Sequence, residues 1–149
     1  MATLYALDAN CYIHALRDAE ERRRLNAFVA RVDTRLRLHA VVHLELRAGA
    51  RTAAQRAALD ALVGTYAARE HVVTPDAAAF AEAGRVLADL AVKEHFAVAD
   101  APPSFRYAAL LAASCREAGL TLVTRNHADF VRVGRHLRGF RVAAPWPSG

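Results

Sequence analysis

Short apolar segments typical of buried strands alternate with longer segments of helical periodicity along most of the chain. The predicted strands are residues 3–8, 36–42, 71–74, 120–124 and 140–143. Predicted helices start at Asn10 and then cover 18–32, 44–50, 52–68, 74–95, 105–118 and 127–133, with a tail over 145–149. This alternation favours a parallel sheet with helices on both faces. The sequence therefore predicts an α/β fold, a three-layer sandwich with a mostly parallel central sheet, in a single domain over 1–149.

Acidic side chains follow apolar segments at three widely separated places. Asp8 ends the first predicted strand, Glu45 comes just after the second, and Asp129 follows Thr124 and Asn126 at the end of the fourth. Ligands of open parallel sheets bind outside the carboxyl ends of the strands, so we expect these side chains to meet at one edge. Converged carboxylates without basic partners repel each other unless a divalent cation lies between them. The pattern therefore predicts a metal-dependent site.

The basic residues outnumber the acidic ones, and nearly all of them are arginine. Lys plus Arg is 20 against 15 for Asp plus Glu, a formal charge of +5, and Lys93 is the only lysine. Arginine pairs well with phosphates and carboxylates, which favours a nucleic-acid backbone or an acidic partner segment. A high-GC genome explains the same bias equally well. The Arg22-Arg23-Arg24 run is interpreted first as a solvated helix face and second as a nucleic-acid contact.

The two cysteines, Cys11 and Cys115, form no CxxC pair and are too few for a disulfide framework. Both lie in apolar contexts, so we expect buried thiols in a reducing compartment, which indicates the cytoplasm. The N-terminus shows no secretory signal pattern. No apolar run approaches the roughly 18 residues of a membrane span, so no membrane partner is expected.

Four short segments stand out along the chain: LDAN at 7–10, HLELRAG at 43–49, LLAAS at 110–114, and LVTRN at 122–126 with Asp129-Phe130 after it. In this order they resemble the PIN-domain family, and more narrowly the VapC-like ribonuclease toxins of prokaryotic toxin–antitoxin pairs. Each segment alone is weak evidence, but four in order at suitable spacing are specific, and the match covers nearly the whole chain.

The resemblance implies a sandwich of helices around a parallel sheet and an acidic pocket that holds Mg²⁺ or Mn²⁺ and cleaves RNA phosphodiesters. Asp8 and Glu45 carry over as metal-binding acids. The third position of the site falls on residue 108, and Asp129, with Asn126 beside it, carries over as the fourth member. Thr124 carries over as a residue that orients a carboxylate or water. The resemblance also implies an antitoxin partner, bound in a groove formed by the early helices and the segment after Glu45, and a homodimer.

One position departs from the family pattern. Ala108 stands where the family has an aspartate directly before the run that is ALLAA at 109–113 here, so catalysis by this chain is in doubt. Mg²⁺ can keep waters in place of a lost protein oxygen, but the attacking water is then less well positioned. Ala108 is either native to a degenerate member or an Asp→Ala change made to produce a toxic nuclease. The intact surrounding motif favours the second explanation, and Asp100 is a less favoured substitute acid.

Two functions from different classes follow. The first is a metal-dependent endoribonuclease toxin, inactivated in this chain at Ala108. The second is a non-catalytic PIN-like module that binds an antitoxin or RNA, with Ala108 as the native residue. A receiver-like phosphoacceptor is disfavoured, because a second acid beside Asp8 and a lysine after a late strand are both missing.

Overall fold

The computed structural model describes residues 2–148, in which five strands and seven α-helices alternate. Met1 and Gly149, at the ends of the predicted domain and tail, lie outside the described residues. The strands are β1 (Leu4–Leu7), β2 (Leu36–His39), β3 (Val72–Val73), β4 (Leu120–Val123) and β5 (Arg141–Ala143). The helices are α1 (Ala9–Arg17), α2 (Ala19–Val32), α3 (Ala40–Gly49), α4 (Ala53–Ala68), α5 (Ala77–Lys93), α6 (Pro103–Glu117) and α7 (His127–Gly134), with short 3₁₀ turns η1 (Asp33–Arg35) and η2 (Val98–Asp100).

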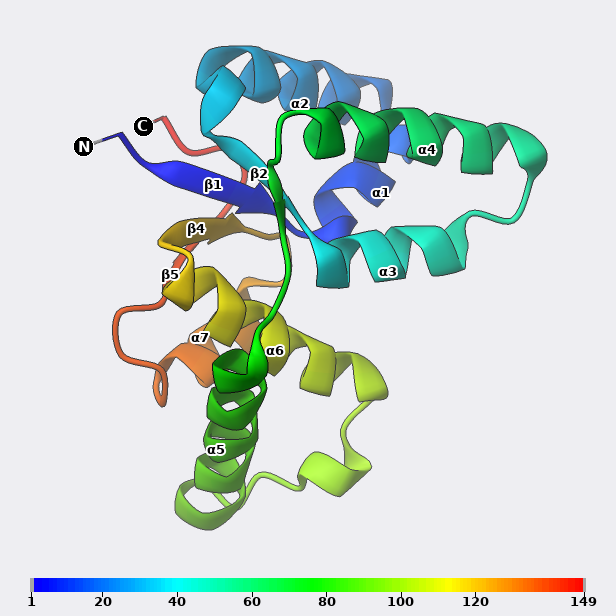
Figure 1. Cartoon of the computed structure of the whole chain (residues 1–149). Helices are drawn as coiled ribbons and strands as arrows, with labels where there is room; N and C mark the ends of the chain where they lie inside the picture. The colour runs from blue at the N-terminus through cyan, green and yellow to red at the C-terminus, as the bar shows by residue number, and fades with distance from the viewer. Residues whose placement is uncertain (1, 149) are drawn as a thin grey trace.

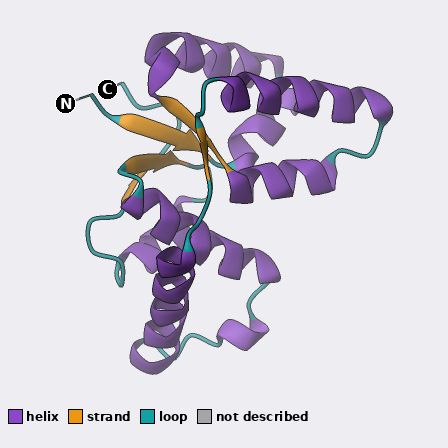
Figure 2. Cartoon of the chain, viewed as in Figure 1, coloured by secondary structure: helices purple, strands orange, loops and turns teal. Residues whose placement is uncertain are grey.

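The five strands form one parallel sheet in the order β3-β2-β1-β4-β5. Figure 1 shows α1, α2 and α4 on one side of this sheet and α5, α6 and α7 on the other. Figure 2 shows the same sheet as the strand layer between two groups of helices. The predicted three-layer α/β sandwich with a mostly parallel sheet is therefore confirmed.

The core lies against the two central strands, β1 and β4. Phe28 from α2 meets Tyr5 of β1 edge to face, with ring centroids 5.3 Å apart, and Trp146 near the C-terminus covers Phe28 at the same distance. Helix α6 is buried from Ala108 to Cys115, which matches its nearly continuous apolar sequence. Both Cys11 and Cys115 are buried free thiols, as the sequence predicts.

Helix starts follow side-chain caps. Thr52 and Gln55 form a reciprocal capping box at α4. The helix predicted from Thr74 starts at Ala77, because its cap is Asp76, whose Oδ1 accepts a hydrogen bond from the Ala79 N–H at 2.9 Å. A carboxylate at this position also interacts favourably with the positive end of the helix, which gives aspartate the advantage over threonine.

The prediction of a strand over 36–42 is wrong beyond His39, because α3 starts at Ala40. The His39 imidazole accepts a hydrogen bond from the Val41 N–H at 3.1 Å and so caps the helix in place of a further strand residue. Val41 and Val42 are buried in the first turn, where packing overrides their preference for strands. Glu45 consequently lies in the second turn of a helix and not just past a strand.

The edge of the sheet that matters for function is formed by the ends of β1 and β4. Leu7 pairs with Val123, and the Asp8 N–H donates to the Val123 carbonyl at 2.9 Å. Asp8 and Thr124 therefore leave the sheet side by side. No helix in the described part of the chain combines the length and hydrophobicity that a membrane crossing requires.

Candidate functional site

Asp8 follows β1 directly and caps α1 in an extended backbone conformation. Its Oδ1 accepts from the Ala9 N–H at 2.8 Å, and its Oδ2 accepts from Thr124 Oγ1 at 2.7 Å and from Asn10 Nδ2 at 3.1 Å. The side chain is buried, and burial raises the pKa of this carboxyl more than the three hydrogen bonds lower it. These three donors are neutral, so they orient the Asp8 carboxylate without cancelling its charge.

Thr124 is the centre of the hydrogen-bond network at this edge. Besides donating to Asp8, its fully buried Oγ1 accepts from Asn10 Nδ2 at 3.1 Å and from the Asn126 N–H at 3.0 Å. The Asn10 Oδ1 in turn accepts from the Arg125 N–H at 3.1 Å. The loop after β4 is thereby fixed to the first turn of α1, and the position of Asp8 depends on both.

Glu45 approaches the same edge from α3. Burial, and to a smaller extent repulsion by Asp8, together raise the pKa of its carboxyl to about 7. Asp8 and Glu45 are 37 positions apart in sequence, but the fold brings them close enough for the charge of Asp8 to act on the carboxyl group of Glu45. We call Asp8 and Glu45 the acid pair.

Asp129 lies in the first turn of α7, where a carboxylate favours the positive end of the helix. Its Oδ2 accepts a hydrogen bond from Asn126 Nδ2 at 2.9 Å. Asn126 is joined through its N–H to Thr124, so Asp129 is connected to Asp8 through two intervening residues. The structure thus joins Asp8, Thr124, Asn126 and Asp129 in one hydrogen-bond network, with Asp129 at its far end, whereas Glu45 is related to it only through the charge of Asp8.

The donor set is smaller than a full carboxylate cage. Within residues 2–148, no three His, Cys, Asp or Glu side chains lie close enough together to hold a metal ion. Over the same residues, no ion pair involves the acid pair or Asp129. Two repelling carboxylates without a basic partner suit Mg²⁺, which commonly binds one or two protein carboxylates and keeps several waters. The acid pair therefore fits a divalent cation, with fewer protein ligands than the sequence pattern of the family suggests.

Ala108 is buried on α6, with 8% of its surface exposed. Helix α6 contacts α3 and leads through a tight turn at Gly119 (φ +69°) into β4. Its first half therefore lies toward the carboxyl edge of the sheet, where the acid pair is found. At this position the protein presents a methyl group and no metal-binding atom. Asp100, the alternative acid, is exposed in η2.

Glu21 and Arg125 form an ion pair beside the site that sequence reasoning missed. Arg125 Nη1 lies 3.3 Å from Glu21 Oε2, and Arg24 Nη1 lies 2.9 Å from Glu21 Oε1. The Glu21 side chain is only 10% exposed. Nothing in the sequence signals this, because Glu21 lies in a strongly charged helix where each charge reads as solvated.

His39 and Ser114 form a buried pair that looks like a base and a nucleophile, with His39 Nε2 2.8 Å from Ser114 Oγ. The Nδ1 lone pair accepts from the Val41 N–H, so in the neutral ring the proton is assigned to Nε2, which donates to Ser114. Burial lowers the pKa of His39 to about 4, which keeps the ring neutral. His39 has no free lone pair to deprotonate Ser114, and the pair serves the helix start.

A groove of about 700 Å³ opens among helices α1 to α4, with Glu45 in its wall. Arg17 and Arg22 add positive charge to an otherwise mostly apolar lining. The groove therefore offers a hydrophobic surface that ends beside the acid pair. Its larger apolar side chains are Ile13, Leu16, Leu25, Leu46, Leu59 and Leu62.

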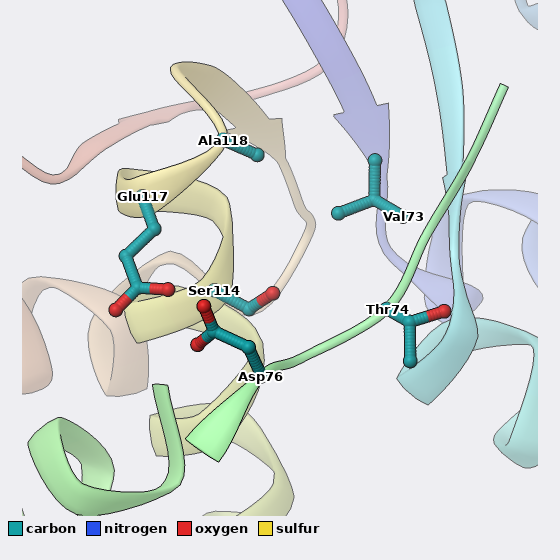
Figure 3. Close-up of a pocket in the computed structure, with 6 residues that line it drawn as sticks. All are labelled: Val73, Thr74, Asp76, Ser114, Glu117 and Ala118. Carbon is teal, nitrogen blue, oxygen red and sulfur yellow. The ribbon is translucent and has the colours of Figure 1, made fainter. Parts of the chain in front are cut away.

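A smaller hollow of about 200 Å³ lies between the start of α5 and the end of α6, and it contains none of the predicted site residues. Figure 3 shows the carboxyl groups of Asp76 and Glu117 facing each other across it. The Glu117 pKa is raised by desolvation and by a hydrogen bond with Asp76, whereas the Asp76 pKa is lowered, first by its helix-cap bond to Ala79. The hollow thus lies around the cap of α5 and two neighbouring carboxyl groups.

Comparisons with known proteins were made for the sequence and for the fold. A search of curated proteins finds no match. Three solved structures align over nearly their whole length, and at these identities they show a shared fold. DNA-bound VapBC from Salmonella typhimurium is 24% identical, with TM-score 0.70 over 96% of this chain and 98% of that chain. VapBC-1 from nontypeable Haemophilus influenzae is 17% identical, with TM-score 0.68 over 95% and 98%, and FitAcB from Neisseria gonorrhoeae is 18% identical, with TM-score 0.68 over 96% and 99%.

The family profile described as PIN domain matches residues 5–136. This range includes the acid pair, Ala108, the Thr124 network and Asp129. The resemblance inferred from the four sequence segments is therefore confirmed, and the chain belongs to the PIN domain family.

Proposed function

We propose that this protein is a metal-dependent endoribonuclease toxin of a toxin–antitoxin pair, with Mg²⁺ or Mn²⁺ bound by the acid pair. The observation that carries the proposal is the position of Asp8 and Glu45 at the carboxyl edge of the sheet, where the charge of Asp8 contributes to the raised pKa of Glu45. Asp8 is buried and Glu45 is half-buried, and the described residues provide no basic partner for them. Membership of the PIN domain family supports nuclease chemistry at such a site.

A divalent cation bound there would supply positive charge to an RNA phosphodiester and would lower the pKa of a bound water. The protein's own residues hold the ligands in place. Thr124 and Asn10 fix the orientation of Asp8, and Thr124 also fixes the start of α7 through Asn126. We propose Asp129 as a further metal-binding acid besides the acid pair, and its indirect connection to Asp8 suits a contact through water.

The charge distribution supports RNA as the substrate. The chain carries a formal charge of +5, and Arg17 and Arg22 lie in the wall that also contains Glu45. Guanidinium groups near the acid pair would bind the phosphates on either side of the cleaved bond. Single-stranded or looped bases are the usual targets of sequence-specific RNA recognition, so we expect an unpaired segment at the site.

The test is the Ala108→Asp variant, which restores the acid expected at this position. Purified variant and parent are compared on single-stranded RNA with Mg²⁺, Mn²⁺ or EDTA. We expect metal-stimulated cleavage by Ala108→Asp that disappears when Glu45→Gln is added, and little cleavage by the parent. A folded, antitoxin-free Ala108→Asp protein without activity would remove the support for the enzyme.

A non-catalytic PIN-like module is the second candidate, because the methyl group of Ala108 leaves the acid pair without the expected third acid. In this case the surface binds an antitoxin or RNA and no bond is broken. Expression of the parent and of Ala108→Asp in bacteria separates the candidates. Growth arrest by the Ala108→Asp form alone supports the enzyme, whereas harmless expression of both forms supports the module.

We propose an antitoxin as the protein partner, with its binding segment in the groove among α1 to α4. The groove has a volume of about 700 Å³, is mostly apolar, and carries Arg17 and Arg22. An amphipathic helix with acidic residues beside its apolar face would complement this surface. The similarity of the fold to VapBC and FitAcB supports the same conclusion.

We propose that the protein works in the reducing cytoplasm as a homodimer. The free thiols of Cys11 and Cys115 support the compartment. The dimer is supported by α5, where Phe80 is 60% and Val92 is 74% exposed on a face without charges. The other exposed residues of that face are Ala77, Ala81, Gly84, Ala88 and Ala91.

Two copies of α5 crossing in antiparallel fashion at Gly84 would place Phe80 of one over Ala88 of the other, large against small. We expect the Phe80→Glu variant to be monomeric in size-exclusion chromatography with light scattering. Val131→Glu, at another exposed apolar residue on α7, is the matched control and should leave the dimer intact. A parent protein that is monomeric at high concentration would contradict the dimer.

A further inference from the structure

We propose that Glu21 is a positioning residue that holds the Arg125 guanidinium away from the acid pair and so keeps the pair free to bind a cation. The inference rests on the proposed metal site, and it assigns a role to an ion pair that does not itself touch the metal ligands. The juxtaposition behind it is a buried carboxylate on α2 next to an arginine on the loop that anchors Asp8.

Arg125 is the basic residue on this loop, and it starts very close to the acid pair. Its N–H donates to Asn10 Oδ1, and Asn10 Nδ2 donates to Asp8 Oδ2. Burial and the charge of Asp8 raise the pKa of the Cys11 thiol to about 12, against the opposing charge of Arg125. Both charges therefore act on the same buried thiol, which places Arg125 within electrostatic reach of Asp8.

Nevertheless, the Arg125 guanidinium points to Glu21, at 3.3 Å, and makes no ion pair with Asp8 or Glu45. Two carboxylates that have no ion-pair partner are an attractive alternative for a guanidinium on a flexible stem. If Arg125 turned to them, it would neutralise the charge that attracts a divalent cation. The arginine is thus a potential internal competitor of the metal.

Glu21 outcompetes the acid pair because its own charge needs compensation. Its side chain is 10% exposed, and an ionised carboxylate that is so far removed from water is unfavourable unless it is paired. Arg24 pairs with Oε1 at 2.9 Å and leaves Oε2 for Arg125. Asp8, in contrast, already has three neutral donors and loses nothing when Arg125 stays away.

A simpler role is also possible for the same contact: the ion pair could only tie α2 to the loop and stabilise the fold. The two roles differ in how Glu21 and Arg125 depend on each other. If Glu21 acts by restraining Arg125, then removal of Arg125 makes Glu21 dispensable for metal binding. If Glu21 only connects α2 to the loop, then replacing either Glu21 or Arg125 loosens the loop. Replacing both residues would then not restore metal binding.

The experiment measures Mn²⁺ affinity of the full chain by electron paramagnetic resonance of free Mn²⁺, together with thermal unfolding. The variants are Glu21→Gln, Arg125→Ala and the double variant. Glu20→Gln is the matched control, since Glu20 precedes Glu21 on α2, is exposed and pairs with Arg23. The Glu20→Gln variant also removes one negative charge from α2, but it leaves the ion pair between Glu21 and Arg125 in place.

We expect Glu21→Gln to weaken Mn²⁺ binding about tenfold or more, since a guanidinium would then lie at the site. Arg125→Ala and the double variant should bind at least as tightly as the parent, and Glu20→Gln should bind like the parent. Equal affinity of Glu21→Gln and parent would overturn the inference alone, as would a double variant as weak as Glu21→Gln. Absence of Mn²⁺ binding in all proteins would overturn the proposed metal site itself, and the inference with it.

Discussion

Replacing Glu45 by glutamine should stabilise the metal-free protein at alkaline pH and leave its stability nearly unchanged at pH 4.5. The pKa of Glu45 is about 7 in the folded protein against an ordinary value of 4.5. Between these values the folded state holds a proton that the unfolded state has lost, so the stability of the parent falls as pH rises through this window. Glutamine cannot ionise, so the variant escapes this loss.

The magnitude follows from the difference between the two pKa values. A shift of this size corresponds to about 3 kcal/mol of lost stability above pH 7, at about 1.4 kcal/mol per pKa unit. Glu45 is half-buried, so solvent reduces the cost of its charge in the folded state. We therefore expect the variant to be about 2 kcal/mol more stable than the parent above pH 7. At pH 4.5 the same linkage is worth less than about 0.5 kcal/mol.

The assay is urea unfolding of parent and Glu45→Gln in EDTA at pH 4.5 and pH 8. A second series at pH 8 contains Mn²⁺, which should stabilise the parent and remove most of the advantage of the variant. Glu70→Gln removes one charge from an exposed site and serves as the control. A difference between Glu45→Gln and parent that is the same at both pH values would refute the raised pKa of Glu45.

Three further changes probe the elements that build the site. Ala108→Asp in metal-free buffer places a buried carboxylate near the acid pair and should lower the unfolding free energy by about 2 kcal/mol. Differential scanning fluorimetry should show Mn²⁺ reversing most of that loss, and a loss unaffected by Mn²⁺ would contradict the location of Ala108. His39→Ala removes the cap of α3 and the bond to Ser114, so urea unfolding should show a loss of about 2 kcal/mol. Thr124→Val removes the hydroxyl donor to Asp8 and should cost about 2 kcal/mol by the same method. Unchanged stability in either variant would mean that the bond is replaced by water.

The sequence was a good guide to the sheet and to the residues that leave its carboxyl edge. The first and fourth strands are predicted within one or two residues, because buried strands of parallel sheets read as short apolar runs between turn residues. Asp8 and Thr124 follow those strands directly, and their hydrogen bond needs no further information than parallel pairing. The roles proposed for them in metal binding and catalysis stay predictions.

The second strand shows where such reasoning stops. The apolar run 36–42 suits a strand or a buried helix equally, and periodicity over so few residues does not separate them. His39 decides between them by capping α3, and its side chain can do so because Ser114 satisfies its other nitrogen. That pairing joins residues 75 positions apart and leaves no local signal.

Glu21 illustrates the same limit for charge. Three neighbouring residues on α2 are exposed arginines, and only the packing of α2 against the loop after β4 makes Glu21 a buried carboxylate. Sequence patterns describe one element at a time, whereas burial of a charge depends on which other element covers it. The helix predicted over 18–32 is confirmed as α2, but the sequence does not identify Glu21 as the charge on it that lies beside the site.

Glu45 belongs to two surfaces of the molecule, because it lies in the wall of the groove and also in the field of Asp8. Any molecule that fills the groove and any cation beside Asp8 therefore experience the same carboxylate, and their binding constants are thermodynamically linked. If one ligand changes the affinity of the other by some factor, the second ligand changes the affinity of the first by the same factor. A dissociation constant for either is consequently defined only at a stated concentration of the second.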